Sequence, residues 1–138
     1  MTQKYRLEKI GYINRNKKIS FKFNGKKYFG YEGDTLASAL LANGVHLVGR
    51  SFKYHRPRGF IGAGVDEPNA KVQLYNGSNT EPNVLATEIE LVEGLVAKSQ
   101  NCWPSVNFDL GAINNFLSKF FPAGFYYKTF MWPKNFWY

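Results

Sequence analysis

A β-hairpin placed early in the chain constrains the fold more than any other sequence feature. Residues 19–23 alternate between apolar and polar side chains, as a half-buried strand does. Asn24-Gly25 is the dipeptide most typical of a two-residue hairpin turn, and residues 26–31 return as a second strand. We therefore predict a hairpin over residues 19–31.

A short helix with signals at both ends follows the hairpin. Asp34-Thr35 offers an N-cap, an apolar helical face comes next, and Gly44 stands where helices often end in a left-handed residue. These signals predict a helix of about nine residues. Further strands are expected at residues 71–75 and 87–91, separated by a turn-rich segment. This order of elements favours an α+β fold of the β-grasp type.

Composition limits the chemistry that the chain can perform. Its 138 residues suit one modest domain with a shorter appendage, and its net charge of +8 suits either anionic partners or a solvated lysine-rich surface. A single cysteine, Cys102, excludes an intrachain disulfide and a thiolate metal site and favours a reducing compartment. There is neither an N-terminal apolar signal region nor a run of about 18 apolar residues. We therefore expect a cytoplasmic protein with no membrane partner.

The candidate binding site is a basic loop, residues 50–58, followed by a glycine-rich turn. No acidic residue occurs between Asp34 and Asp66, so positive charge is concentrated in this loop. Arginine forks bind carboxylates and phosphates through paired hydrogen bonds, and glycines let backbone N–H groups approach an anion closely. The predicted contact residues are Arg50, Lys53, His55, Arg56, Arg58, Gly59, Gly62 and Gly64.

Three interpretations of the basic loop stay open. In the first, its arginines pair with Asp66, Glu67 or the acids of a protein partner, while Phe52 and Tyr54 pack against the helix. In the second, they contact a phosphate-bearing cofactor directly. In the third, basic and aromatic side chains together hold a single nucleic acid strand by charge and stacking. We favour an anionic cofactor group or a neighbouring subunit and expect no nucleic-acid partner.

The other chemistry-bearing residues point to structural roles. The spacing Gly59-x-x-Gly62-x-Gly64 matches no nucleotide-binding fingerprint. His46 and His55 have no metal-ligand partner at useful spacing, and Cys102 has no histidine near it in the sequence. We therefore predict no catalytic residue and no metal ligand in this chain.

The chain changes character at a boundary near residues 95–105. We divide it into a domain over residues 1–100 and a connecting segment over residues 101–138, with a helix expected at 110–120 and an aromatic tail beyond it. The tail carries more aromatic surface than so small a domain covers, which favours docking onto a missing partner surface. Two alternatives are a tail that wraps its own domain and a segment at a membrane interface.

Several long motifs resemble one known family. They are GYEGDTLASALLANGVHLVGRSFKYHRPRG, EPNA, GLVAKSQNCWPS, FDLGAINNFLS and FFPAGFYYKTFMWP. Together they resemble the N-terminal region of the alpha subunits of heterotetrameric sarcosine oxidases. The resemblance implies a domain related to plant-type two-iron two-sulfur ferredoxins, which agrees with the β-grasp expectation. Cluster-bearing relatives carry C-x4-C-x2-C after the RPRG element, and the matching frame here is Ile61, Asp66 and Asn69, so the resemblance implies a scaffold without an iron–sulfur cluster.

The resemblance also implies a function for the assembly to which such a domain belongs. Enzymes of this family use flavins to demethylate sarcosine to glycine, with hydrogen peroxide and formaldehyde or methylenetetrahydrofolate as further products. FAD, FMN and NAD are expected in the complete complex and none of them on this chain, which lacks a dinucleotide-binding fingerprint and is expected to be inactive alone. The expected partners are the rest of the alpha subunit and the other subunits. The alternative is a redox-partner or standalone interaction module without catalytic activity.

Overall fold

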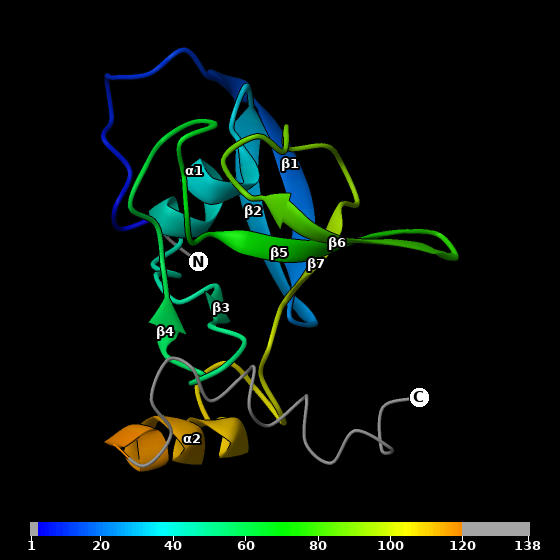
Figure 1. The fold of residues 1–138 in the computed structure, drawn as a ribbon. Helices are drawn as coiled ribbons and strands as arrows, with labels where there is room; N and C mark the ends of the chain where they lie inside the picture. Colours follow the sequence, from blue (N-terminus) through cyan, green and yellow to red (C-terminus); the bar gives the residue numbers. More distant parts are fainter. Residues whose placement is uncertain (1–2, 120–138) are drawn as a thin grey trace.

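The computed structural model describes residues 3–119, and its framework is a mixed five-stranded sheet with one helix packed on it (Figure 1). The strand order is β2-β1-β7-β5-β6, with β1 parallel to β7 and every other neighbouring pair antiparallel. The strands are β1 (Asn14–Phe23), β2 (Lys26–Glu32), β5 (Lys71–Asn76), β6 (Asn79–Leu85) and β7 (Val96–Ser99). A separate two-stranded sheet pairs β3 (Gly49–Arg50) with β4 (Pro57–Arg58). The α+β, β-grasp expectation is confirmed.

The predicted hairpin and helix are both present. The turn residues Asn24 and Gly25 have φ of 52° and 78°, as a type I′ turn requires, and β1 and β2 extend the hairpin at its open end. The helix α1 (Leu36–Ala42) has seven residues between Thr35 and Asn43, which cap its two ends. Thr35 and Ser38 form a capping box, because each side chain accepts a hydrogen bond from the backbone N–H of the other.

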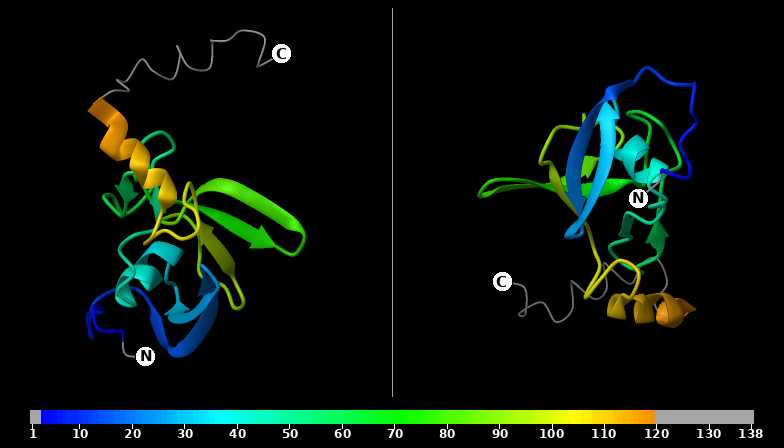
Figure 2. Two further views of the ribbon diagram at one scale, coloured as in Figure 1. Left: turned by 90° about the horizontal axis from the view of Figure 1, so that it is seen from below. Right: turned by 180° about the vertical axis from the view of Figure 1, so that it is seen from behind.

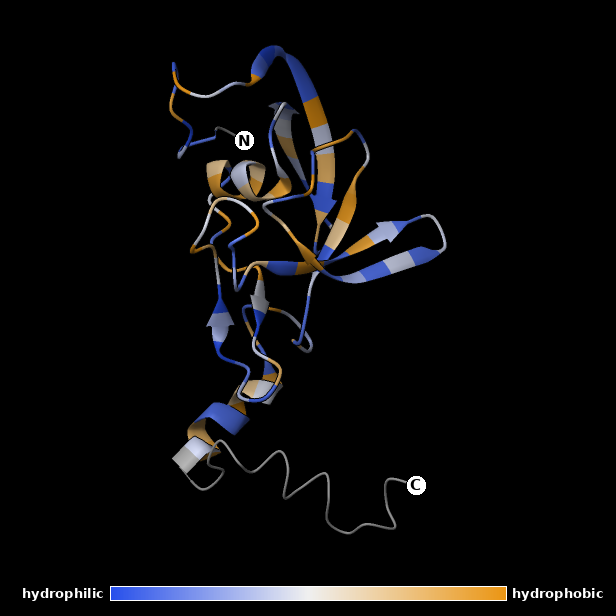
Figure 3. Ribbon diagram, turned by 45° about the horizontal axis from the view of Figure 1, so that its top comes forward, coloured by the Kyte–Doolittle hydropathy of each residue, from blue (hydrophilic) through white to orange (hydrophobic). Residues whose placement is uncertain are grey.

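The hydrophobic core lies between α1 and the sheet. Phe21 and Phe23 of β1 and Leu36 and Leu40 of α1 are fully buried in one cluster. Figure 3 colours α1 largely as hydrophobic, in keeping with its five buried residues. Burying an aliphatic or aromatic side chain contributes about 2 kcal/mol, so this cluster stabilises the packing of α1 on the sheet.

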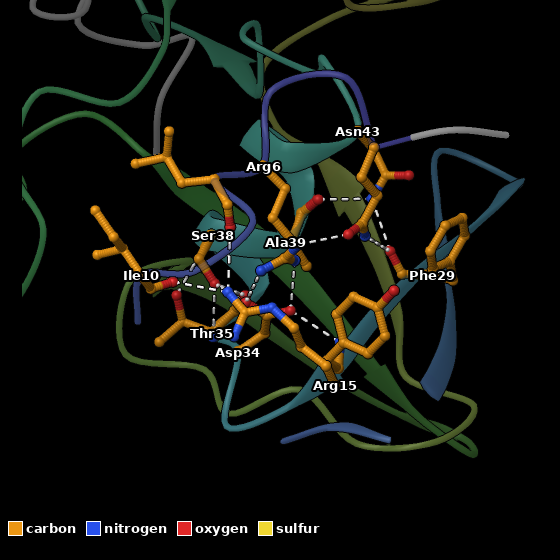
Figure 4. A network of polar contacts seen from close by, with 12 residues as sticks. Arg6, Ile10, Arg15, Phe29, Asp34, Thr35, Ser38, Ala39 and Asn43 are labelled. Atoms are coloured by element: carbon orange, nitrogen blue, oxygen red, sulfur yellow. Dashed lines mark hydrogen bonds and ion pairs between the residues drawn. The ribbon is translucent and has the colours of Figure 1, made fainter. Parts of the chain in front are cut away.

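A buried ion pair ties the N-terminal segment to the start of α1. Arg6 donates to both carboxylate oxygens of Asp34, at 3.0 and 2.6 Å, and the Asp34 side chain is almost completely buried. Asp34 also accepts from the backbone N–H of Tyr31 at 2.8 Å and from the hydroxyl of Ser38 at 2.8 Å. Figure 4 shows this network, together with Arg15 beside the carbonyl of Ile10. The buried carboxylate is therefore fully paired.

The prediction of a strand at residues 87–91 is wrong. Within this segment, the alternating Ile89 and Leu91 are buried, but their backbone pairs with the entrance of α1 and not with a ladder. The carbonyl of Ile89 accepts from Leu36 N at 2.8 Å, and Leu91 N donates to the carbonyl of Asp34 at 2.9 Å. The alternation of apolar and polar residues therefore arises because one side of an irregular segment is buried.

Two strands of the five-stranded sheet, β6 and β7, were not predicted, and neither were the two-residue strands β3 and β4. β6 occupies the segment that looked turn-rich, where Gly77, at φ 61°, closes a tight turn from β5. Pro82 lies within β6 and is compatible with that strand because β6 is at the edge of the sheet. β7 has only four residues, too few for a recognisable alternation. In the part of the chain that the structure describes, no helix is long and apolar enough to cross a membrane.

Candidate functional site

The basic loop forms a small hairpin built on β3 and β4. Residues 51–56 form its turn, in which Ser51 N donates to the carbonyl of Arg56 at 2.9 Å and Arg56 N donates to Ser51 Oγ at 2.9 Å. His55 has φ of 53°, a left-handed conformation that turns the chain sharply before β4. The local backbone therefore fixes the directions of the cationic side chains.

Asp109 is the centre on which this hairpin converges. Its side chain is fully buried, and its Oδ2 lies 2.7 Å from His55 Nδ1 and 3.6 Å from Arg50 Nε. Its Oδ1 accepts from the backbone N–H groups of Trp103, at 2.9 Å, and Gly111, at 3.1 Å. Burial alone would raise the pKa of Asp109, but the hydrogen bonds from Trp103, His55 and Gly111 outweigh it and hold the pKa below its ordinary value. An ionised Asp109 accepts only, so His55 Nδ1 carries the proton in this contact.

The Arg50 side chain donates its hydrogen bonds to backbone carbonyl groups of this chain. Its Nε donates to the carbonyl of Val106 at 2.9 Å and its Nη1 to the carbonyl of His55 at 2.8 Å. Backbone contacts run alongside, since Arg50 N donates to the carbonyl of Gln100 at 3.1 Å and Asn101 Nδ2 donates to the carbonyl of Arg50 at 3.1 Å. The Arg50 side chain thus joins the basic loop to the connecting segment.

The remaining cations divide between two neighbours. Arg56 Nε donates to Asn115 Oδ1 at 2.9 Å and its guanidinium lies over the Tyr54 ring at 4.9 Å. Lys53 Nζ lies 5.1 Å from the centroid of the same ring. Arg58 turns the other way and donates to the side-chain oxygen of Asn69. The structure therefore brings Arg50, His55 and Arg56 together against the connecting segment and places Arg58 beside the 61–70 loop.

The described part of the connecting segment, residues 101–119, lies along the basic loop (Figure 1; Figure 2). It contains three short helical turns, in place of the single helix expected at 110–120, whose last residue lies outside the described range. They are η1 (Leu110–Ala112), α2 (Ile113–Phe116) and η2 (Leu117–Lys119). The division of the chain at residue 100 stays a prediction, and the aromatic tail lies outside the described residues.

Close packing explains one predicted glycine and one that was missed. A Cβ on Gly59 would lie 2.6 Å from the carbonyl oxygen of His46, so no larger residue fits there without a backbone shift. A Cβ on Gly111 would lie 2.3 Å from the His55 ring. Gly62 is tight against Glu67, whereas the space at Gly64 is ordinary. Gly111 therefore lets the connecting segment approach His55 closely.

Glu67 organises the 61–70 loop. Its residue is 2% exposed, and its Oε2 accepts from Ile61 N at 2.7 Å and Gly62 N at 2.6 Å. Its Oε1 accepts from Asn69 N at 2.7 Å and Ala70 N at 3.1 Å. Burial would raise the pKa of Glu67, but the four backbone N–H groups outweigh it and the pKa lies below its ordinary value. Glu67 is thus an ionised buried carboxylate paired with main-chain donors.

Sequence reasoning missed Asp109 and assigned Glu67 a different partner. The interpretation in which the arginines meet Asp66 or Glu67 named the wrong acid for Arg50, which lies beside Asp109. Asp109 precedes Leu110-Gly111, a pattern typical of an N-cap, and its side chain does cap η1 through Gly111 N. That signal was available, but it says nothing of the contact with His55.

Cys102 does not have the environment of a nucleophile. Burial and then the charge of Asp109 raise the pKa of its thiol above the ordinary value. It lines a cleft of about 830 Å³ together with Phe23, Val45 and Val106. The thiol therefore stays protonated at neutral pH and packs as a small apolar group.

The chain matches the model of one protein family over residues 16–102, the 2Fe-2S iron-sulfur cluster binding domain. The chain belongs to this domain family. An iron–sulfur cluster of the ferredoxin type needs four thiolates, and this member of the family has one cysteine. Among the residues that the structure describes, no three His, Cys, Asp or Glu side chains gather as a metal site. The residues of this family member therefore do not fit the cluster.

The proteins to which this chain is similar are much longer than the chain. The chain is 62% identical, over 96% of its length, to sarcosine oxidase subunit alpha of Rhizobium meliloti (strain 1021), and covers 14% of that protein. It is 38% identical, over 62% of its length, to sarcosine oxidase subunit alpha of Corynebacterium sp. (strain U-96), and covers 9% of it. The crystal structure of L-proline dehydrogenase from P. horikoshii matches 67% of the chain with a TM-score of 0.51 and 29% identity, over 17% of that chain. The resemblance to sarcosine oxidase alpha subunits is confirmed, and the chain spans less than a fifth of each relative.

Proposed function

We propose that this chain is the N-terminal domain of a sarcosine oxidase alpha subunit, where it acts as a cytoplasmic scaffold and docking element. The identity to alpha subunits over nearly the whole chain supports this assignment. Sarcosine and proline are both secondary amines, so the structural likeness to a proline dehydrogenase points to the same class of oxidoreductase. The role within that enzyme follows from the surface of the connecting segment.

One observation carries the docking role: the connecting segment is fixed in place while its apolar side chains face solvent. Leu110, Ile113 and Phe116 are 53%, 62% and 81% exposed, and their spacing of three residues puts them along one side of successive helical turns. Phe108 is also largely exposed. Contiguous exposed apolar surface on a rigid segment marks a protein interface. We infer that the rest of the alpha subunit or a neighbouring subunit covers it.

The chemistry belongs to the assembly in this proposal. Flavins bound by other parts of the complex would supply the oxidation of sarcosine, with oxygen as the final electron acceptor and hydrogen peroxide, glycine and formaldehyde or methylenetetrahydrofolate as the products. FAD, FMN and NAD are the cofactors that we assign to the complete heterotetramer. In this proposal the domain contributes a scaffold and a contact surface for the other parts of the complex.

The test is co-expression of the chain with the remaining parts of the complex, comparing wild type with Ile113→Ser/Phe116→Ser. Docking predicts that the double variant loses co-purifying subunits, and that flavin content and sarcosine-dependent peroxide formation fall with them. Tyr12→Ser is the matched control, because Tyr12 is fully exposed in the N-terminal segment, before β1. Unchanged assembly of the double variant would contradict the docking role.

A second pair of substitutions separates docking from cofactor contact. Arg56→Glu/Arg58→Glu reverses two cationic side chains of the basic loop. Loss of flavin from an intact assembly would support the cofactor interpretation, whereas loss of subunits would support the interface. A complex that oxidises a different N-methyl amine and not sarcosine would change the substrate and leave the docking role in place.

A further inference from the structure

We propose that the 61–70 loop is an anion-binding nest, which this chain fills with its own Glu67 carboxylate where cluster-bearing members of the family hold a metal cluster. Nests of successive backbone N–H groups bind anions in many phosphate and iron–sulfur sites. The proposal concerns what replaced the cofactor, and it stands independently of the sarcosine oxidase assignment.

The geometry is that of a bound anion held from two sides. Ile61 and Gly62 donate to one carboxylate oxygen from the start of the loop, and Asn69 and Ala70 donate to the other from its end. Glu67 thus closes the loop by joining two arms that are separated by six residues in the sequence. Four charge-assisted hydrogen bonds on one buried carboxylate make a strong site.

The position of the donors links this nest to the cluster. In the frame that aligns the chain with C-x4-C-x2-C, Ile61 and Asn69 stand where two cysteines would be. The backbone N–H groups of both residues now point at Glu67. Neither side chain can ligate iron as a thiolate does, so the carboxylate supplies the negative charge and the cross-link that the cluster would otherwise provide.

The surroundings support an anion at this place. Arg58 reaches the side chain of Asn69 from β4, so a cation lies next to the loop. Gly62 leaves little room beside the Glu67 backbone, since an added Cβ would lie 3.2 Å from Glu67 Cα. Without the carboxylate, four N–H groups would lose their acceptor; the bond from Ala70 is buried and the other three are partly buried, and donors left unpaired away from water are costly.

The test removes the Glu67 carboxylate and asks whether a free anion binds in its place. Glu67→Ala removes the carboxylate, and formate is the probe because it carries the same charged group in a volume that the lost side chain vacates. We expect the variant's Tm to fall by roughly 10 °C, and formate to restore part of that loss in a saturable manner, whereas sodium chloride at equal ionic strength does not. Absence of formate rescue in the folded variant would overturn the proposal.

Glu93→Ala is the matched control. The Glu93 carboxylate also accepts hydrogen bonds, but both come from the single residue Ser20, through its N–H and its Oγ, and Glu93 lies exposed on the surface. Formate should not change the Tm of this variant beyond the effect of salt. Equal rescue of both variants would show a general formate effect and overturn the specific site.

A measurement on the wild-type chain decides the matter if Glu67→Ala fails to fold. Amide hydrogen exchange should be at least roughly tenfold slower at Ile61, Gly62, Asn69 and Ala70 than at the exposed turn residue Gly77, because the first four are hydrogen-bonded in the nest. Exchange at the rate of Gly77 would contradict the nest. This readout does not depend on any activity of an assembled enzyme.

Discussion

Asp109 Oδ2 lies 2.7 Å from His55 Nδ1, and this contact joins the connecting segment to the basic loop across 54 residues of sequence. The same carboxylate is reached by Arg50 and by two backbone N–H groups. Arg50 and His55 of the basic loop therefore anchor the connecting segment, while the predicted contact of this loop with a cofactor or a neighbouring subunit stays a prediction.

Asp109→Asn should loosen this anchor. The amide keeps the shape but loses the charge that Arg50 and His55 face, so the free energy of unfolding should fall by about 2 kcal/mol. Chemical denaturation measures the change, with the exposed Asp66→Asn as control. Equal stability of the two variants would remove Asp109 from its central role.

Gly111→Ala should lower the free energy of unfolding only when His55 is present. The new methyl group would collide with the imidazole at 2.3 Å, and the expected loss is about 2 kcal/mol. In a His55→Ala background the same substitution should be nearly neutral, because the ring is gone and alanine suits a helical turn. A double-mutant cycle measures this coupling, and additive effects would argue against the close contact.

Stability should fall as the solution becomes acidic. The folded-state pKa values of Glu67 and Asp109 both lie below their ordinary values, so the stability that these groups contribute is complete above those ordinary values, near 4.5 and 3.8. It is lost as the pH falls through the lowered folded-state values. Thermal unfolding across this pH range should show a steep decline that Glu67→Gln flattens.

A matched exposed carboxylate tests the origin of that decline. The pKa of Glu93 is also lowered, by hydrogen bonds from Ser20, but Glu93 is solvent-exposed. Glu93→Gln should therefore flatten the acid decline less than Glu67→Gln. The opposite ranking would contradict the importance of the buried nest.

Arg6→Ala should free the N-terminal segment. It leaves the buried Asp34 carboxylate without its cation, which should cost about 3 kcal/mol and expose residues 3–12 to proteolysis. Limited proteolysis with mass spectrometry measures the cut sites. Lys17→Ala breaks an ion pair that is exposed on the surface and should leave the digestion pattern unchanged.

Local signals predicted the local structure well. Asn24-Gly25 and the Thr35 cap act through neighbouring backbone atoms, and both appear as the sequence indicates. The alternation at Ile89 and Leu91 was misread because burial of one side produces the same pattern in a strand and in an irregular segment.

The site could be predicted only in part, because its key contacts are tertiary. The sequence marks Arg50 and His55 as part of a positive loop, but nothing local shows that their acid comes from residue 109. The absence of cluster thiolates is plain from the composition, whereas the use of Glu67 as an acceptor for four main-chain donors requires the folded loop.

The central claim is that this ferredoxin-like domain folds and binds no iron–sulfur cluster. Anaerobic reconstitution with iron and sulfide tests this claim most directly. We predict that the refolded, desalted chain retains no stoichiometric iron or acid-labile sulfide and shows no visible charge-transfer absorbance, because it has one cysteine and its 61–70 loop is closed on Glu67. Two irons and two sulfides per chain, with the visible spectrum of a ferredoxin, would contradict the account.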